Sequence, residues 1–245
     1  MKTICSVFPT AKFSINESEV ELYREAIPSG HDVSVHPDMP LPQTVNWILD
    51  NYKEECILIF SDEIEYVLRV CPPQKRIRDP GTILQIVENS WRVAMDCDIG
   101  VFSWTINTNY TLLRPYVRPI RSCGPCSGHA IGIRGPARER RFNPNFIRCA
   151  DYDFTLESIL QDRAVMLDVR YHFASGKMTA GGRGGGGSSG LFTNEQYISA
   201  RKALSEKWGR YVSSGSSKTG KFTAERGDYA GMSVRVERLS NLAAK

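Results

Sequence analysis

The sequence predicts an α/β fold with a mostly parallel mixed sheet flanked by helices. Short apolar runs of strand length alternate with stretches whose apolar residues repeat every three to four positions, from residue 3 to residue 104. The composition, with 41% hydrophobic and 24% charged residues, is that of an ordinary globular protein, and 245 residues suit a single domain. No internal repeat of fixed period interrupts this order, which excludes a repeat architecture.

The first elements are two short strands with a helix between them. Residues 3–8 and 32–36 are predicted strands, and the amphipathic stretch between them begins at Asn16, a residue type that commonly caps helices. A helix is predicted over residues 42–52, because a proline suits its first turn. Cys56–Phe60 follows with the length and β-branched content of a buried strand.

The later elements continue the alternation. A helix begins at Asp79-Pro80-Gly81, and its apolar residues follow the 3.6-residue period. Further strands are predicted at residues 99–104, 129–134 and 164–173, and further helices at residues 154–162 and 194–211. Strands that alternate with helices in this way favour parallel pairing through crossover connections.

A glycine-dense stretch divides the chain. Residues 179–190 contain too much glycine to pack, so they form a mobile loop or a linker. We therefore expect a catalytic core over residues 1–175, a Gly-rich mobile loop over residues 176–193, and a basic C-terminal helix and tail over residues 194–245.

Positive charge is concentrated in the later parts of the chain. The net charge is +4, but residues 174–245 hold 12 Lys and Arg against 5 Asp and Glu, and residues 114–148 hold eight arginines against one acid. Such clusters indicate a polyanionic partner such as DNA, although a solvated basic surface is the alternative. The candidate nucleic-acid contacts are Arg138, Arg140, Arg141, Arg183 and Lys202.

No membrane or secretion signal is predicted. No apolar run approaches the roughly 18 residues that span a bilayer, and Lys12 interrupts the N-terminal apolar stretch. Seven cysteines at irregular spacing fit reduced thiols. We therefore expect a cytoplasmic protein without membrane partners.

The pair Cys123-Gly-Pro-Cys126 has three interpretations. As a redox motif it requires a strand before it and a helix after it, and neither is predicted here. With His129 and the distant Cys149 it offers a zinc site, but a single CxxC is weak evidence for one. A turn with two incidental thiols is the third interpretation, and the one we favour.

The most informative stretch is the end of the predicted strand Cys56–Phe60. Three carboxylates, Asp62, Glu63 and Glu65, follow it directly. A hard cation relieves the repulsion of such closely spaced carboxylates, and ligands of open α/β sheets bind at the carboxyl ends of strands. The stretch therefore suggests a divalent metal that holds a phosphorylated ligand, with a solvated acidic turn as the alternative.

Other candidate site residues lie near helix starts and on the last strand. Arg76 and Arg78 precede the helix that begins at Asp79 and are candidates for phosphate contact, or else solvated loop arginines. A regular strand over residues 164–173 would place His172 on one face with Asp168 and Arg170.

Several short motifs together carry a resemblance to a known family. In order they are SDEIE, DPGT…ENSWR, GxFSWT, CADYDFTL, LDVRYHF and the Gly-rich stretch. This order resembles the GT-A class of nucleotide-sugar glycosyltransferases and, more narrowly, the TET-associated DNA glycosyltransferases of phages. The resemblance covers residues 1–192 and leaves the basic tail unassigned. A Glu stands where the family pattern has an Asp, so which acid would touch the metal stays open.

The resemblance implies a GT-A-like, Rossmann-like fold and an enzyme that needs Mn²⁺ or Mg²⁺. Asp62, Glu63 and Glu65 would hold the metal against the donor pyrophosphate, with His172 completing the metal shell. Asp151 or Asp153 would face the acceptor hydroxyl and take its proton, while the other would cap a helix. The donor would be a nucleotide sugar, with a UDP-sugar favoured.

The expected activity is transfer of a sugar to 5-hydroxymethylcytosine-type bases of phage DNA in the infected host cell. Two alternatives from other classes remain. One is a nucleic-acid-binding module without catalysis, in which the acids are structural. The other is a nuclease or nucleotidyltransferase that uses the same acids for metal-assisted phosphoryl transfer.

Overall fold

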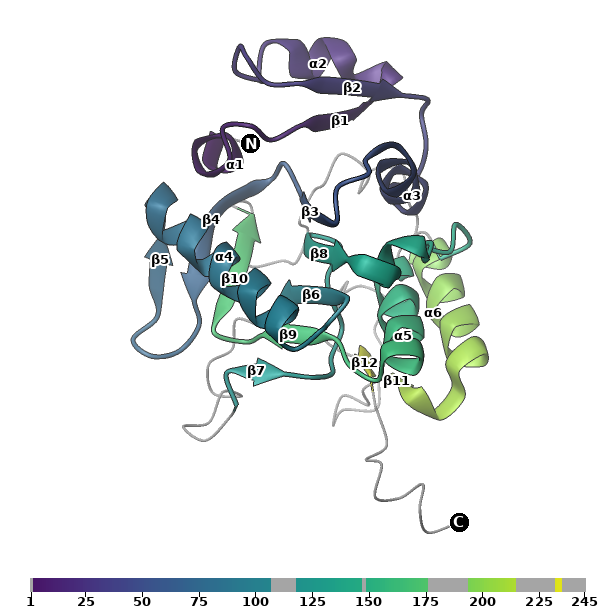
Figure 1. Cartoon of the computed structure of the whole chain (residues 1–245). Coiled ribbons are helices and arrows are strands. Elements are labelled where there is room, and N and C mark those ends of the chain that lie inside the picture. Colours follow the sequence, from purple (N-terminus) through teal and green to yellow (C-terminus); the bar gives the residue numbers. More distant parts are fainter. Residues whose placement is uncertain (1, 107–117, 147–148, 176–193, 215–231, 235–245) are drawn as a thin grey trace.

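The central sheet of the computed structural model has five strands in the order β3-β8-β6-β9-β7 (Figure 1). The structure describes residues 2–106, 118–146, 149–175, 194–214 and 232–234. The strands are β3 (Cys56–Phe60), β6 (Val101–Trp104), β7 (Ile120–Arg121), β8 (Ala130–Arg134) and β9 (Met166–Asp168). The chain is thus α/β with a mixed central sheet flanked by helices in a single domain, as predicted at this level.

The prediction of a mostly parallel sheet is wrong. Only the pair β6–β9 is parallel among the four strand pairs of this sheet. The antiparallel strand β8 lies between β3 and β6, with Ile131 opposite both Ile59 and Ser103. Since β3 and β6 both oppose β8, they run in one direction, and β9 shares it. Their carboxyl ends and the start of β8 therefore meet at one edge of the sheet.

A second sheet of three antiparallel strands follows the order β10-β4-β5. It contains β4 (Ile64–Arg69), β5 (Lys75–Ile77) and β10 (Tyr171–Ser175), and neither β4 nor β5 was predicted.

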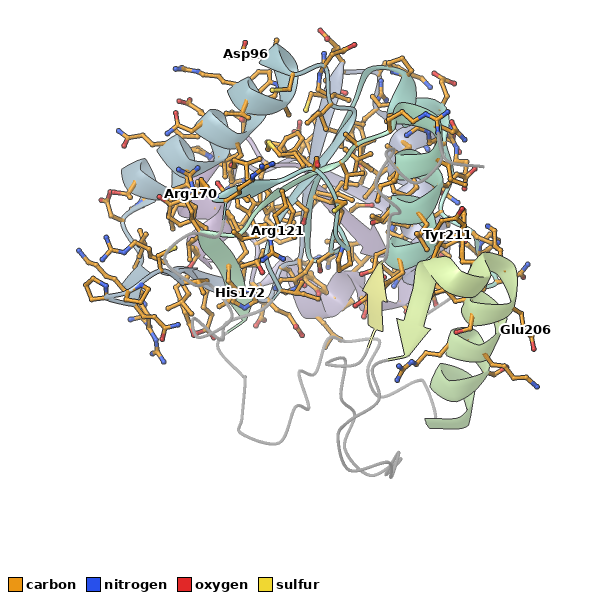
Figure 2. All side chains as sticks on the ribbon, turned by 90° about the horizontal axis from the view of Figure 1, so that it is seen from below. Asp96, Arg121, Arg170, His172, Glu206 and Tyr211 are labelled. Atoms are coloured by element: carbon orange, nitrogen blue, oxygen red, sulfur yellow. The ribbon has the colours of Figure 1, made fainter. Side chains whose placement is uncertain are left out.

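The predicted strand over residues 164–173 is broken into β9 and β10. The Asp168 carboxylate accepts hydrogen bonds from the Arg170 backbone N–H at 3.0 Å and from the Arg170 guanidinium at 2.8 Å. These bonds favour a turn over a continuous strand. His172 therefore belongs to a different sheet from Asp168, and Figure 2 shows His172 on β10 and Arg170 at the preceding turn.

Helices cover the two faces of the central sheet. The helices α1 (Lys2–Val7) and α4 (Pro80–Asp96) pack with Phe102 and Trp104 on one face. The helices α3 (Leu41–Asn51), α5 (Ala150–Asp162) and α6 (Asn194–Trp208) pack with Val101 and Ile131 on the other. Val101 and Phe102 face opposite ways because successive side chains of a strand alternate.

The N-terminal elements form a small unit above β3 in Figure 1. The strand β1 (Phe13–Asn16) pairs in parallel with β2 (Val33–His36), and the short helices η1 (Glu17–Glu19) and α2 (Val20–Arg24) connect them. Asn16 therefore ends a strand, and its amide donates to Glu19 at 2.9 Å rather than capping a helix.

Residues 3–8 were predicted as a strand, but all of them except Phe8 belong to the helix α1. Ile4 and Val7 are buried against the α4 side of the core. Four of the residues 3–8 are apolar, which is compatible with either a strand or a helix, so packing decides between them. The remaining short elements are η3 (Gly135–Glu139), η4 (Gly209–Tyr211), and the antiparallel strands β11 (Val212–Ser214) and β12 (Met232–Val234).

Gly132 in β8 gives a test of core packing. A Cβ at this position would lie 2.2 Å from the Phe102 ring, whereas a Cβ at Gly81 in the first turn of α4 would meet its nearest atom at 3.6 Å. We expect Gly132→Ala to lower the free energy of unfolding by about 1–3 kcal/mol, because the buried ring must move. Gly81→Ala is the matched control and should leave it unchanged or raised. Equal urea midpoints for the two variants would contradict this packing.

Candidate functional site

A cleft of about 1290 Å³ lies between the N-terminal elements and β3, the edge strand of the central sheet. Residues of β1, α3 and the whole of β3 line it, together with the turn after β3, the loop before β8 and the start of α5. The cleft therefore includes the carboxyl end of β3, and ligands of open α/β sheets bind at the carboxyl ends of strands.

The floor of the cleft is the open edge of β3. The Ser61 N–H donates to the His129 carbonyl at 2.8 Å, which fixes the register of β3 on β8. Because bonding direction alternates along a strand, the backbone groups of Cys56, Leu58 and Phe60 point away from β8. All three residues line the cleft.

The acidic turn after β3 places two of the three predicted carboxylates in the cleft. Asp62 and Glu63 line it, held in a turn in which Ser61 Oγ accepts from the Glu63 N–H at 3.4 Å. Glu65 instead belongs to β4, is exposed, and does not line the cleft. The structure therefore groups Asp62 with Glu63 but not with Glu65.

Tyr23 from α2 reaches this turn. Its hydroxyl donates to Asp62 Oδ2 at 2.8 Å. Burial raises the pKa of Tyr23, and its hydrogen bond to Asp62 raises it further, so the phenol remains a donor. The sequence carries no signal that would pair residues 39 positions apart in this way.

Two neutral histidines lie close to each other, and His129 lines the cleft whereas His172 does not. His172 Nδ1 donates to the Thr105 carbonyl at 2.8 Å, and its buried Nε2 has no hydrogen-bond partner among the described residues. Burial lowers the pKa of His129 to about 4, with a further lowering from nearby His172 and a partial rise from Asp62. Burial also lowers the pKa of His172. Both imidazoles are therefore neutral at pH 7.

Asp151 lies in the first turn of α5 and lines the same cleft. Its carboxylate accepts hydrogen bonds from the backbone N–H groups of Tyr152, at 3.0 Å, and Gly128. These bonds favour the charged form, but burial outweighs them and raises the pKa of Asp151 to about 6. A carboxyl with this pKa is suited to exchanging protons near neutral pH.

Asp153 faces the other way. It is 1% exposed, accepts from Trp208 Nε1 at 2.6 Å and pairs with Lys207 Nζ at 2.7 Å. Residues two apart on a helix project about 200° apart, so one carboxylate enters the cleft and the other joins α5 to α6. The structure thus separates two candidates that sequence spacing left equal.

The two arginines proposed as phosphate contacts lie outside the cleft lining. Arg76 and Arg78 are exposed and stand over the Tyr66 ring, at 4.9 and 5.9 Å from its centroid. At the start of α4, Asp79 Oδ2 already accepts from the Thr82 N–H at 2.8 Å. A carboxylate therefore occupies the position that a phosphate would take at this helix terminus.

Three predicted nucleic-acid contacts have internal partners. Arg138 donates to backbone carbonyls at the end of α3, Arg140 forms a bidentate pair with Asp162, and Arg141 pairs with Asp50. These guanidinium groups hold helices together in this structure. Lys202 is exposed on α6 with Glu206 at 3.9 Å, and Arg183 and the predicted loop over residues 176–193 lie outside the described residues.

The cysteines of the CxxC pair differ in their surroundings. Cys126 is buried and Cys123 is exposed, and no disulfide joins any of the seven cysteines, all of which are described. Burial raises the pKa of Cys126 to about 12, so it is a thiol at neutral pH.

The cleft is acidic. Its charged lining comprises one lysine and six carboxylates, namely Lys12 with Glu19, Asp38, Glu54, Asp62, Glu63 and Asp151. Lys12 lies 3.6 Å from Glu54. An anionic ligand therefore requires a cation to enter this cleft.

Comparisons with known protein families, curated proteins and solved structures give no match for this chain. None of the helices in the described part of the chain has the length and apolar character needed to cross a membrane. Across those same residues, no three His, Cys, Asp or Glu side chains are grouped closely enough to hold a metal ion.

Proposed function

We propose that the chain is a metal-dependent GT-A-like glycosyltransferase that uses a nucleotide-sugar donor. The observation that carries this proposal is the pairing of two carboxylates in one cleft. Asp151, with its pKa raised to about 6, and Asp62, held by Tyr23, both line the cleft that includes the carboxyl end of β3. Carboxyl groups in such different environments are typical of sites that move protons.

A divalent cation fits this cleft on chemical grounds. Asp62 and Glu63 line the cleft and offer carboxylate oxygens, whereas His172, which was expected to complete the metal shell, does not line it. Mg²⁺ takes only one or two protein carboxylates and draws its other ligands from water and phosphate oxygens. When bound, such a cation supplies charge neutralisation for a departing diphosphate.

Asp151 is the proton acceptor in this proposal. Its raised pKa makes it a stronger base than an ordinary carboxylate, and it is still ionised above pH 6. Backbone N–H groups of Gly128 and Tyr152 fix its orientation toward the cleft. An acceptor hydroxyl that reaches the cleft would lose its proton to Asp151 as it attacks the sugar.

The finer proposal is that the acceptor is a 5-hydroxymethylcytosine-type base in DNA. It is supported by the family resemblance and by the +7 charge of residues 174–245. The acidic cleft repels a phosphate backbone, so a single flipped base would enter while the backbone stays outside. Arg138, Arg140 and Arg141 have internal partners and are not assigned to DNA in this proposal.

The test is release of UDP from UDP-sugars with Mn²⁺ or Mg²⁺, with and without hydroxymethylated DNA. We expect divalent-dependent release that Asp62→Ala lowers at least tenfold and Glu65→Ala leaves unchanged, because Glu65 lies outside the cleft. Mass spectrometry of the DNA identifies the transferred sugar. Turnover without any divalent dependence would contradict the metal assignment.

The two alternatives give different results in the same assay. DNA nicking or nucleotide incorporation with metal and no sugar donor indicates phosphoryl transfer. Salt-sensitive DNA binding that survives in Asp62→Ala and Asp151→Ala, without turnover, indicates a binding module.

A further inference from the structure

The hydrogen bond between Tyr23 and Asp62 connects the two sides of the cleft. Tyr23 lies on α2 in the N-terminal unit, Asp62 lies in the turn between β3 and β4, and both line the cleft. The phenol oxygen is 2.8 Å from Asp62 Oδ2. A bond from a hydroxyl to a carboxylate is charge-assisted and stronger than one between neutral groups.

The helix that carries Tyr23 is anchored by little apolar burial. The helix α2 has five residues, none of which is buried, and Leu22 beside Tyr23 is 76% exposed. The preceding η1 also has no buried residue. Since apolar burial does not hold this segment in place, a polar contact to the opposite side of the cleft contributes a large share of its order.

We propose that Tyr23 is a positioning residue that orients the Asp62 carboxylate and ties α2 to the acidic turn. Because of this bond, the position of α2 depends on the Asp62 carboxylate, and the orientation of that carboxylate depends on the position of α2. The consequence for cation binding at Asp62 rests on the proposed function, whereas the tie between α2 and the turn does not.

Hydrogen exchange tests the tie without any ligand. We expect Tyr23→Phe, which removes only the hydroxyl, to speed amide exchange about tenfold in both residues 20–24 and residues 61–64. Asp62→Ala should speed exchange in the same two segments, and the double variant should match Asp62→Ala, because Asp62→Ala already removes the bond that Tyr23→Phe removes. The control is Tyr66→Phe on β4 outside the cleft, which should leave both segments unchanged. Unchanged exchange of residues 61–64 in Tyr23→Phe would overturn the proposal.

Mn²⁺ titration tests the consequence at Asp62. A residue that orients a metal-binding carboxylate is expected to change metal affinity by about 10- to 100-fold. Tyr23→Phe should therefore raise the Kd for Mn²⁺ by that factor, with Tyr66→Phe at the wild-type value. Equal Kd values in wild type and Tyr23→Phe refute the positioning role. Absence of Mn²⁺ binding in the wild type refutes the metal-dependent function instead, and the exchange data then decide the role of Tyr23.

Discussion

Asp151→Asn is expected to lower sugar-donor turnover by about 10²- to 10⁴-fold and, above pH 6, to raise the stability of the folded chain. The loss of turnover follows from removing a general base, whose contribution is usually of that size. The gain in stability follows because burial makes the charged carboxylate unfavourable in the folded state. Lower turnover together with higher stability is the expected result of replacing a residue that serves activity rather than folding.

The pH dependence of stability has a definite sign. Burial raises the pKa of Asp151 from 3.8 in an ordinary environment to about 6 in the folded chain. Between these values the folded state retains a proton that the unfolded state has lost, so the free energy of unfolding falls as pH rises. The fall amounts to up to about 3 kcal/mol and is complete above pH 6. Asp151→Asn lacks this dependence and should exceed the wild type by up to that amount at pH 8.

Urea unfolding at pH 5 and pH 8, together with a pH–rate profile, measures both effects. Wild-type turnover should rise through pH 6 as Asp151 ionises, while the residual turnover of Asp151→Asn should not. Glu157→Gln is the matched control, since Glu157 lies on the same helix outside the cleft. If Asp151→Asn is destabilised at pH 8 and retains wild-type turnover, Asp151 only caps α5.

Elements with a strong local signal were predictable from sequence. Cys56–Phe60 is a strand at the predicted bounds, and α4 begins after Asp79 as its Asp-Pro-Gly start indicates. The helices α3, α5 and α6 also lie close to their predicted positions. In each case one short segment contains both the apolar pattern and the residues that end it.

Features that depend on distant partners were not predictable. The direction of β8 is set by pairing with β3 and β6, and an apolar run carries no direction. The break after Asp168 depends on one side chain that accepts from Arg170. The burial of β4 does not alternate along its six residues, and β5 has only three residues.

The candidate site also combines features that were predictable from sequence with features that were not. The carboxylates themselves were found from sequence, because acids after a strand are a local signal. Which of them enter the cleft was not predicted. Glu65 lies in β4 outside the cleft, and Asp153 contacts Lys207 and Trp208, more than 50 positions later in the chain. Tyr23 was missed because only the folded chain brings α2 to the acidic turn.

Asp153→Ala is expected to lower the free energy of unfolding by about 2–4 kcal/mol. The carboxylate is 1% exposed and accepts from both Trp208 and Lys207, and bonds to a charged group contribute more than neutral ones. Removing one partner of a fully buried ion pair costs about 3–5 kcal/mol. Lys207 is 40% exposed, so water can hydrate its ammonium group when Asp153 is removed. The expected cost is therefore lower than for a fully buried pair.

Chemical unfolding at pH 8, followed by tryptophan fluorescence, measures this loss. The matched control is Lys202→Gln, which removes an exposed pair with Glu206 on the same helix and should change stability by less than about 0.5 kcal/mol. A cycle with Lys207→Met isolates the ion pair from the bond to Trp208. At pH 8, Asp151→Asn and Asp153→Ala should therefore shift stability in opposite directions, although both remove a carboxylate from the first turn of α5. A shift in the same direction would mean that the two acids are not divided between the cleft and the α6 contact.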